Sequence, residues 1–243
     1  MNSILINKSL NEVQIFETVQ GEATFIGVPS FFIRLQGCSV RCFFCDEKKT
    51  WSLDSRLGAN FTYEAVLDCL LTLNPNLKRV VITGGEPTEQ DVLPFIKFLN
   101  ASGYSVAMES AMSGTYAESV LDFIEAQDAF RKAALNLNRE SQNSIPFWLT
   151  FSPKEIYSEN GRASSLRAFH LAHEIKFVIA DLQAVDYLEQ IIIPESLKAP
   201  KPIFLVPDWN NKEKNQTYIL SLLKKYPDLL RLGIQAHKYW NLA

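Results

Sequence analysis

The sequence predicts an α/β fold in which a parallel sheet is built from repeated strand–helix units. Short apolar runs alternate with amphipathic stretches along most of the chain, and this alternation is typical of βαβ units. One run, residues 78–83, is of the short apolar kind found in buried parallel strands. Polar clusters follow several of the runs, and functional groups in such folds collect at the carboxyl ends of the strands.

The predicted elements follow one another in regular order. The first strand, Pro29–Leu35, leads into a loop with three cysteines, and the polar, glycine-bearing end of residues 15–22 predicts a loop before it. Thr62 opens an amphipathic helix that extends to about Leu73, and Gly103 ends a later helix. The later strands are expected at residues 78–83, 104–109, 147–151, 174–179, 203–206 and 230–234. The helices between them are expected at residues 89–101, 116–137, 164–173, 183–193 and 212–225.

The composition is that of one globular domain covering residues 1–243. The chain is 47% hydrophobic and 21% charged, and it shows no glycine- or proline-rich linker. Its net charge of −3 provides no basic field for nucleic acid. No stretch approaches the roughly 18 apolar residues of a membrane span. Four cysteines without a signal peptide predict a cytoplasmic, reducing location.

Three cysteines with C-x3-C-x2-C spacing, Cys38, Cys42 and Cys45, are the strongest chemical signal in the chain. A four-iron cluster normally takes four thiolates, so three in one loop suggest a cluster with one iron open to a ligand. The alternatives are a zinc site completed by a distant residue, or a disulfide with a spare thiol. Zinc ligands usually come as two tight pairs, and no histidine lies near the loop. The fourth cysteine, Cys69, is predicted to be a small buried apolar residue of a helix.

Other polar residues follow or interrupt the apolar runs. Gly84 and Gly85 offer backbone that a ligand can approach closely, and Glu86 offers an acceptor for a ligand ammonium group. Arg34 lies inside an apolar run, and a buried guanidinium needs an anionic partner such as a carboxylate. His170 and His173 are expected to be a surface or packing pair and not metal ligands.

Together these residues resemble the radical S-adenosylmethionine superfamily, whose C-x3-C-x2-C signature has an aromatic residue, here Phe44, before the last cysteine. Gly84-Gly85-Glu86-Pro87 resembles the glycine-rich strand end of that superfamily. Within it, the chain is similar to the 7-carboxy-7-deazaguanine synthase family. The motifs that carry this resemblance span nearly the whole chain: residues 17–22 (ETVQGE), 32–38 (FIRLQGC), 83–87 (TGGEP), 152–154 (SPK), 174–176 (EIK) and 235–239 (QAHKY).

The resemblance implies a partial (βα)6 barrel with the cluster at its carboxyl-end mouth. It implies a lyase that converts 6-carboxy-5,6,7,8-tetrahydropterin to 7-carboxy-7-deazaguanine with loss of ammonia, in the biosynthesis of queuosine and other deazapurines. The implied cofactors are a 4Fe–4S cluster, S-adenosylmethionine and Mg²⁺. The implied partners are the pterin, an electron donor such as flavodoxin or ferredoxin, and a second copy in a homodimer, with no direct contact to nucleic acid or membrane.

The same resemblance assigns roles to residues at matching positions. The cluster ligands are Cys38, Cys42 and Cys45, and Arg34 pairs with the carboxylate of the pterin. The cofactor-binding residues are Phe44, Asp46, Gly85, Glu86, Ser110, Ser152, Pro153 and Lys154. The other substrate-binding residues are Val19, Gln20, Gly21, Thr83, Gln235, His237, Lys238 and the terminal Ala243.

The chain departs from the family pattern at two places. The family usually has threonine or serine after Cys-Asp, and that hydroxyl binds Mg²⁺, whereas this chain has Glu47. A carboxylate is a good ligand for Mg²⁺, so we expect Glu47 to bind it directly; the alternative is that Glu47 repels the substrate carboxylate. The family's Glu-Thr-Ser-Gly-Thr is lengthened here to residues 109–115, so that either Ser110 or Ser113 faces the cofactor.

Two rival functions fit part of this pattern. One is a radical S-adenosylmethionine activase that installs a glycyl radical on a partner protein, although such activases usually lack the Gln-x-His-Lys motif of residues 235–238. The other is a non-catalytic protein that binds zinc or a cluster. Turnover of free pterin separates the first rival from a lyase, and metal and sulfide analysis separates the second.

Overall fold

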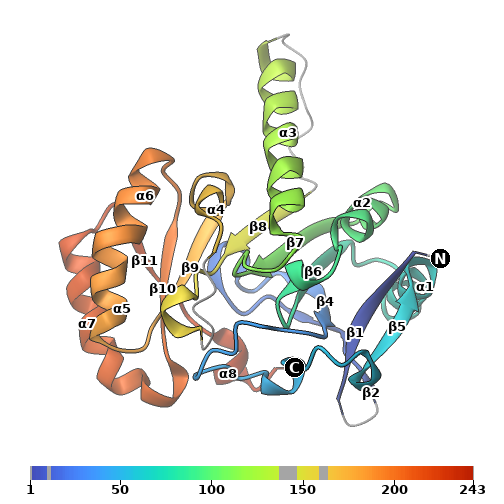
Figure 1. Ribbon diagram of the computed structural model, residues 1–243, viewed down its shortest axis with the longest axis horizontal. Coiled ribbons are helices and arrows are strands. Elements are labelled where there is room, and N and C mark those ends of the chain that lie inside the picture. Colours follow the sequence, from blue (N-terminus) through green and yellow to red (C-terminus); the bar gives the residue numbers. More distant parts are fainter. Residues whose placement is uncertain (1, 10–11, 137–146, 159–163, 243) are drawn as a thin grey trace.

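The computed structural model describes residues 2–9, 12–136, 147–158 and 164–242, and its centre is a curved sheet with a parallel half (Figure 1). Seven strands run parallel to one another in the order β4-β6-β7-β8-β9-β10-β11. Within this order, sequence neighbours lie side by side, as expected for right-handed crossovers. The parallel strands are β4 (Pro29–Leu35), β6 (Arg79–Gly84), β7 (Ser105–Ser110), β8 (Phe147–Phe151), β9 (Glu174–Ile179), β10 (Ile203–Pro207) and β11 (Leu230–Leu232).

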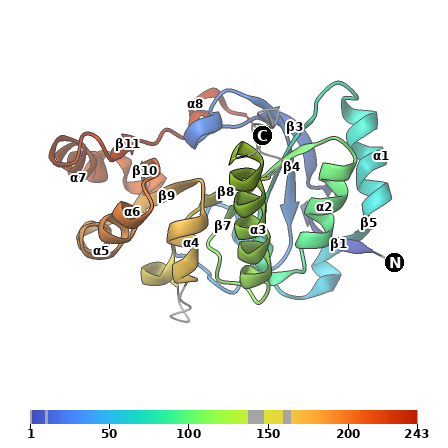
Figure 2. The ribbon, with the colours of Figure 1, turned by 90° about the horizontal axis from the view of Figure 1, so that it is seen from above.

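Six of these strands are each followed by at least one helix, which confirms the predicted arrangement of repeated βα units. Figures 1 and 2 show helices α1 to α7 flanking the curved sheet, with α3 extending away from the body of the molecule. None of the described helices is both long and apolar enough to span a bilayer. The helices are α1 (Tyr63–Leu73), α2 (Leu93–Ala101), α3 (Ala117–Asn136), α4 (Leu166–Leu171), α5 (Leu182–Tyr187), α6 (Ile193–Lys198), α7 (Lys212–Lys225) and α8 (Ala236–Trp240).

Four strands that add to the sheet in antiparallel fashion were not anticipated from the sequence. They are β1 (Ser3–Ser9), β2 (Glu12–Val13), β3 (Ile15–Val19) and β5 (Gly58–Thr62). β3 pairs with β4 along its whole length, and β1 pairs with β5 and with the end of β4. Because β3 is half-buried on both faces, its sequence lacks the clean apolar–polar alternation that marks a strand. The predicted loop therefore begins only after Val19.

Several predicted helix boundaries also needed correction. α2 begins at Leu93 and not at residue 89, because Pro87–Glu89 forms a 3-10 turn and Gln90 is extended. The Gln90 amide instead bonds Leu5, accepting from its N–H at 2.9 Å and donating to its carbonyl at 2.9 Å. The helix predicted at residues 183–193 continues through a π-helical turn, Leu188–Ile192, into α6. The helix predicted at residues 164–173 is confined to α4, and α8 was not expected.

Alternation along β4 separates the core from the interior of the sheet. Phe31, Ile33 and Leu35 are fully buried in the core. The intervening Phe32 and Arg34 instead line a cavity on the concave side. Strand β4 therefore carries cavity-lining side chains on one face while its other face packs in the core.

α1 is fixed at its start by Thr62, whose hydroxyl accepts from the Ala65 N–H at 3.2 Å.

The segment between β3 and β4 passes under the concave side of the sheet. Its aromatic residue Phe25 packs edge-to-face on Trp148 of β8, with ring centroids 4.9 Å apart, and the guanidinium of Arg79 lies 3.5 Å from the Phe25 ring. The N–H of Thr24 donates to the Glu174 carboxylate of β9 at 3.1 Å. The segment therefore contacts β6, β8 and β9 at or next to their first residues, at the strand ends away from the cavity.

Candidate active site

A cavity of about 570 Å³ lies on the concave side of the sheet, at the carboxyl ends of its strands. Residues of β4, β6, β7, β9 and β10 and residues that follow β8 and β11 form its wall, as predicted for this fold class. Nearly all of the predicted site residues line it: Val19, Gln20, Gly21, Arg34, Cys38, Cys42, Phe44, Cys45, Asp46, Glu47, Thr83, Gly85, Glu86, Ser110, Ser152, Lys154, Gln235, His237 and Lys238. Pro153 is buried outside this lining, and Ala243 lies beyond the described residues.

The three cysteines of the loop share the cavity wall and none forms a disulfide. Two backbone hydrogen bonds close the loop, from the Gly37 N–H to Thr50 at 2.8 Å and from the Cys38 N–H to Trp51 at 3.3 Å. Gly37 and Arg41 have positive φ angles of 103° and 54°, so the loop turns sharply beside the thiols. Phe44 packs edge-to-face on Tyr157 with centroids 4.7 Å apart and forms an apolar wall next to them.

The chemistry of the three thiols fits a cluster. Burial raises the pKa of Cys38 and of Cys42 to about 11, and it also raises the pKa of Cys45. Thiols with such pKa values lose their protons when iron binds them. In the part of the chain that the structure describes, no three acidic, histidine or cysteine side chains converge on a single ion position. Thiolates are the usual ligands of iron–sulfur clusters, so three cysteines on one cavity wall suit such a cluster.

The glycines at the end of β6 line the cavity, and the backbone around them supplies a second reason for glycine besides the expected approach of a ligand. Gly84 has φ 116°, and a Cβ there would lie 2.2 Å from the Leu35 nitrogen. A Cβ on Gly85 would lie 2.1 Å from the Gly37 carbonyl oxygen. The close approach that requires glycine is therefore made by the chain's own backbone, between the β6 turn and the cysteine loop.

Glu86 ties the ends of β6 and β7 together. Its Oε1 accepts from the Thr88 hydroxyl at 2.5 Å, the Thr88 N–H at 3.1 Å and the Ser110 hydroxyl at 2.5 Å. Its Oε2 accepts from the Ala111 N–H at 2.8 Å. Burial raises the pKa of Glu86, and these hydrogen bonds act in the opposite direction. One oxygen is saturated, while Oε2 retains capacity to accept from a ligand.

The two extra residues after Glu109 leave Ser110 and not Ser113 in the cavity wall. The Ser110 hydroxyl also accepts from the Met112 N–H at 2.8 Å, and Met112 has φ 52°. Gly114 then packs against the backbone of Thr88. A Cβ on Gly114 would lie 2.2 Å from the Thr88 carbonyl carbon. Ser110 and Gly114 are therefore both held by neighbouring residues, and the extra residues of the longer segment lie between them.

Lys154 is a cation of the cavity wall. Its Nζ donates to the Ser152 hydroxyl at 2.5 Å and lies 5.7 Å from the centre of the Phe44 ring. The Ser152 hydroxyl in turn donates to the Lys176 carbonyl at 2.8 Å. Burial lowers the pKa of Lys154, and the nearby positive charge of Lys176 lowers it further. A ligand anion in the cavity would stabilise its charged form.

An ion cluster of Lys176, Glu22 and Glu109 forms the floor of the cavity, and the sequence alone predicts no role for it. Lys176 Nζ lies 2.5 Å from Glu22 Oε2 and 2.9 Å from Glu109 Oε2. Gln20 donates to Glu109 at 2.9 Å, and Gln235 donates to Glu22 at 2.9 Å. Charged residues inside the apolar strands β7 and β9 were the available signal, the same one that identified Arg34.

The charges in this floor are mutually stabilised. Burial alone would lower the pKa of Lys176, but the two carboxylates outweigh burial and raise it well above its ordinary value. Burial would raise the pKa of Glu109, but Lys176 and the Gln20 hydrogen bond outweigh burial and lower it. Lys176 and Glu109 are therefore ionised at neutral pH.

Arg34 and Glu47 meet at another wall of the cavity. Arg34 lies opposite Thr83 in the β4–β6 register. Its Nη2 is 3.6 Å from Glu47 Oε1, and Glu47 Oε2 is 3.3 Å from Lys49 Nζ. The Nε of Arg34 and the Oε2 of Glu47 are buried without a hydrogen-bond partner.

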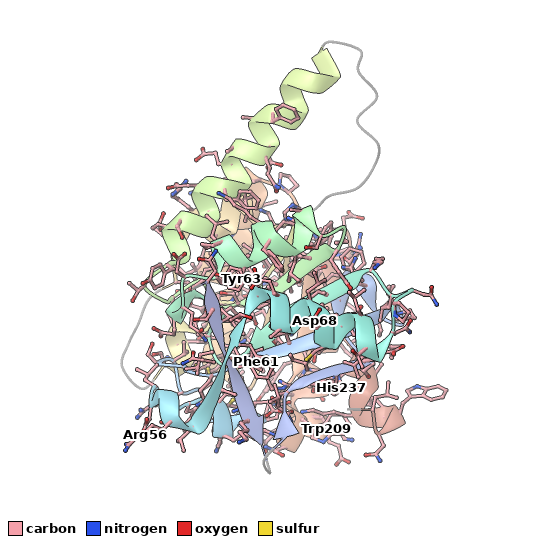
Figure 3. The ribbon with its side chains drawn as sticks, turned by 90° about the vertical axis from the view of Figure 1, so that its right-hand side faces the viewer. Arg56, Phe61, Tyr63, Asp68, Trp209 and His237 are labelled. Atoms are coloured by element: carbon pink, nitrogen blue, oxygen red, sulfur yellow. The ribbon has the colours of Figure 1, made fainter. Side chains whose placement is uncertain are left out.

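The C-terminal segment closes the cavity from the other side. The Ala236 N–H donates to the Gly21 carbonyl at 2.9 Å, and a Cβ on Gly21 would lie 2.5 Å from His237 Nδ1. Lys238 forms an ion pair with Asp46 at 2.9 Å, which lowers the pKa of Asp46 against the opposing effect of burial. Figure 3 shows His237 and Trp209 at the end of the molecule opposite α3.

The two histidines of α4 and its flank lie outside the cavity lining, as predicted. His170 forms a surface ion pair with Glu195 at 3.0 Å. His173 stacks on Trp148 with centroids 4.8 Å apart, and its Nδ1 accepts from the Leu149 N–H at 3.0 Å. Cys69 also lies outside the lining, on α1, where it is part-buried and not fully buried as expected.

Comparison with known proteins agrees with this geometry. A family model described as a 4Fe–4S single cluster domain matches residues 19–128, which include the three thiols. The 7-carboxy-7-deazaguanine synthase of Buchnera aphidicola is 31% identical over 94% of this chain and 97% of its own length. The chain belongs to the 7-carboxy-7-deazaguanine synthase family.

Two further findings support the family assignment. The 7-carboxy-7-deazaguanine synthase of Aquifex aeolicus is also 31% identical, over 96% of this chain and 94% of its own length. The crystal structure of QueE from Escherichia coli superposes with a TM-score of 0.72 at 26% identity, covering 97% of this chain and 95% of that one. The predicted α/β fold of the radical S-adenosylmethionine kind is thereby confirmed. As a 7-carboxy-7-deazaguanine synthase family member, the chain is a radical S-adenosylmethionine enzyme with a 4Fe–4S cluster.

Proposed function

We propose that the chain is a lyase that converts 6-carboxy-5,6,7,8-tetrahydropterin to 7-carboxy-7-deazaguanine with loss of ammonia, as a step towards queuosine and other deazapurines. The observation that carries this proposal is the sharing of one cavity by three thiols and by Arg34. The thiols suit a cluster, and the guanidinium suits the carboxylate that substrate and product both carry. The family membership of the whole chain supports the same substrate.

Cys38, Cys42 and Cys45 would hold the cluster, which with bound S-adenosylmethionine supplies the radical chemistry. Phe44 and Lys154 form an apolar and cationic wall beside the thiols, suited to the adenosyl and carboxylate parts of that cofactor. The Oε2 of Glu86 can accept from its ammonium group. The other proposed contacts are Asp46, Gly85, Ser110 and Ser152, while buried Pro153 fixes the turn that presents Ser152 and Lys154.

The pterin would lie between the ion-cluster floor and the C-terminal segment. Arg34 would hold its carboxylate, and Gln20, Thr83 and His237 present polar groups to its ring. α8 covers the cavity and limits access of water to the reacting atoms. Val19, Gly21, Gln235, Lys238 and the terminal carboxylate of Ala243 complete the proposed substrate contacts.

Glu47 would be a direct ligand of Mg²⁺. Its Oε2 is buried, accepts no hydrogen bond and contacts the partly exposed Lys49 at 3.3 Å, so it is a hard oxygen donor that Mg²⁺ could take over from that surface ion pair. The adjacent Asp46 and the carboxylate of the substrate are further oxygen donors. An E47A variant whose Mg²⁺ dependence matched that of the unchanged enzyme would contradict this assignment.

The electron donor would be a small acidic redox protein such as flavodoxin or ferredoxin. Arg41 and Lys48 are exposed in the cysteine loop, and among the described residues neither forms an ion pair. Phe43, 55% exposed, lies between two cluster ligands. A basic, partly apolar surface so close to the thiols suits an acidic partner that delivers an electron.

We propose further that residues 1–243 act as one catalytic domain in the cytoplasm and pair as a homodimer. One sheet runs through the described chain, and all four cysteines are free, in keeping with a reducing compartment. Leu232 and Ile234 are 51% and 46% exposed at the last strand of the sheet, an apolar edge that a second copy could cover. Light scattering would detect a particle of twice 27.6 kDa, and a monomer mass would contradict the dimer.

An anaerobic assay tests the function directly. Cluster-reconstituted protein is mixed with the pterin, S-adenosylmethionine, Mg²⁺ and a reductant, and the product is identified by mass spectrometry. We expect the deazapurine acid. Formation of 5′-deoxyadenosine without that product would retain the superfamily chemistry and reject the substrate, while zinc without sulfide in metal analysis would reject the catalytic proposal.

A further inference from the structure

Glu47 lies against the group proposed to bind the substrate carboxylate. Among the described residues, it is the one carboxylate within ion-pair distance of the Arg34 guanidinium, with Nη2 and Oε1 3.6 Å apart. Both side chains are largely buried, 17% and 22% exposed, in the cavity wall. The chain therefore carries its own carboxylate next to the site where a ligand carboxylate would pair.

The contact between the two groups is loose. At 3.6 Å it is longer than a charge-assisted hydrogen bond, which is typically about 2.7–2.9 Å. The Nε of Arg34 is buried without a hydrogen-bond partner, and the buried Oε2 of Glu47 has only an ion-pair contact, with Lys49 Nζ at 3.3 Å. A buried polar group without a good partner is costly, so each group gains by taking a better one. For Arg34 that partner is an anion, and for Glu47 it is a cation.

Lys49 is the only other described cation in ion-pair contact with Glu47, at 3.3 Å, and it is 47% exposed. Solvent screens such a pair and weakens it. Bringing a second carboxylate to Arg34 would place it near the Glu47 charge, and like charges in a partly buried site repel. A divalent cation between the two carboxylates reverses this repulsion, because both can bind it.

We propose that Glu47 pairs with Arg34 in the metal-free enzyme and that Mg²⁺ draws Glu47 away, so that Mg²⁺ binding and binding of the pterin carboxylate promote each other. The inference rests on the proposed function, since it takes Arg34 as the site of that carboxylate. Linkage requires the effect to be reciprocal: the pterin raises the affinity for Mg²⁺ by the factor by which Mg²⁺ raises the affinity for the pterin.

Calorimetric titration of the cluster-reconstituted protein with 6-carboxypterin, an oxidised and unreactive relative of the substrate, tests this proposal. For the unchanged enzyme we expect Mg²⁺ to tighten binding of the probe by about tenfold. Without Mg²⁺, E47Q should bind the probe about tenfold more tightly than the unchanged enzyme does, because the competing charge is gone. Added Mg²⁺ should then improve binding to E47Q by less than about threefold.

Two further variants sharpen the result. K49Q leaves Arg34 as the remaining close cation for Glu47, so Glu47 should compete more strongly for Arg34. This variant should therefore bind the probe more weakly than the unchanged enzyme when Mg²⁺ is absent. E64Q, an exposed change in the first turn of α1, is the matched control and should behave like the unchanged enzyme. Iron and sulfide content shows whether each variant keeps its cluster.

Binding of the probe that is independent of Mg²⁺ in the unchanged enzyme overturns the inference, whatever the variants do. E47Q binding no tighter than the unchanged enzyme without Mg²⁺ also overturns it. The product assay of the unchanged enzyme is separate. Product formation without linkage rejects this inference alone, and linkage without product rejects the proposed reaction while the linkage stands.

Discussion

The absence of a side chain at Gly85 determines how the cysteine loop meets the rest of the site. Gly85 lies against the Gly37 carbonyl, and the next N–H, that of Glu86, donates to that same carbonyl at 2.8 Å. The contact joins the end of β6 to the loop of the three thiols. Because the neighbouring Gly37 oxygen belongs to the backbone, it cannot move aside by a change of side-chain rotamer.

We therefore expect G85A to lose iron. A Cβ 2.1 Å from the Gly37 oxygen must displace the cysteine loop, at a cost of about 1–3 kcal/mol in the free energy of unfolding. Iron and sulfide per chain after reconstitution should fall well below the unchanged value. The control is G103A, where φ is 84° and a Cβ meets nothing within 4 Å, so stability falls by about 1–2 kcal/mol but the cluster is retained. Equal iron contents in the two variants would contradict the prediction.

Gly21 should respond differently, because its neighbour belongs to the proposed substrate site. A Cβ there would lie 2.5 Å from His237 Nδ1, which displaces the His237 side chain and the start of α8. We expect G21A to raise the KM for the pterin about tenfold or more while iron content stays unchanged. Steady-state kinetics with quantified cluster measures both. A variant with unchanged KM would show that His237 does not contact the pterin.

At the scale of elements, the ion cluster connects four parts of the chain that are distant in sequence. Glu22 comes from the loop after β3, Glu109 from β7 and Lys176 from β9, and Gln235 joins them from the segment before α8. Each strand is secured by its backbone ladder, whereas the loop after β3 and the C-terminal segment meet through these side-chain contacts and the backbone hydrogen bond from the Ala236 N–H to the Gly21 carbonyl. Lys176 is the common partner of both carboxylates.

Replacing Lys176 by methionine should destabilise the fold by about 3–5 kcal/mol, because two buried carboxylates lose their cation. In the unchanged protein, the lowered pKa of Glu109 contributes stability that is present above its unfolded pKa and is lost as pH falls through the folded value. In K176M, burial without a cation raises the pKa of Glu109 on folding, so stability is lost as pH rises. Chemical denaturation should show a smaller loss at pH 5 than at pH 7.5, and a loss independent of pH would contradict the prediction.

The sequence was informative where a signal is local and silent where it depends on distant partners. Pro29–Leu35 and Lys212–Lys225 were predicted with their observed bounds, because apolar runs and helical periodicity are short-range patterns. Strand β3 is defined by pairing with β4, and the role of Gly85 by Gly37, which lies far away in sequence. Arg34 was recognised as a charge in an apolar strand, whereas Lys176 carries the same signal and was given no role.

At the scale of the whole molecule, the charge distribution separates the cluster loop from the rest of the surface. The chain has a net charge of −3, yet Arg41 and Lys48 are exposed in the loop that carries the thiols. Lys48 Nζ lies 5.5 Å from the centre of the Trp51 ring, which keeps the cation beside the loop. The proposed acidic donor would therefore be attracted to the face nearest the cluster.

The double variant R41E/K48E tests this surface with an internal control. Reversal of two charges should lower the turnover rate driven by reduced flavodoxin about tenfold at low ionic strength, and the difference should shrink as salt is added, because salt screens surface charges. Turnover driven by dithionite, which needs no protein docking, should be unchanged. The matched variant K214E/K224E makes the same change in net charge on exposed positions of α7. If both variants lose flavodoxin-driven turnover equally, the effect belongs to net charge and not to the cluster face; if dithionite-driven turnover also falls, the loop itself has been damaged.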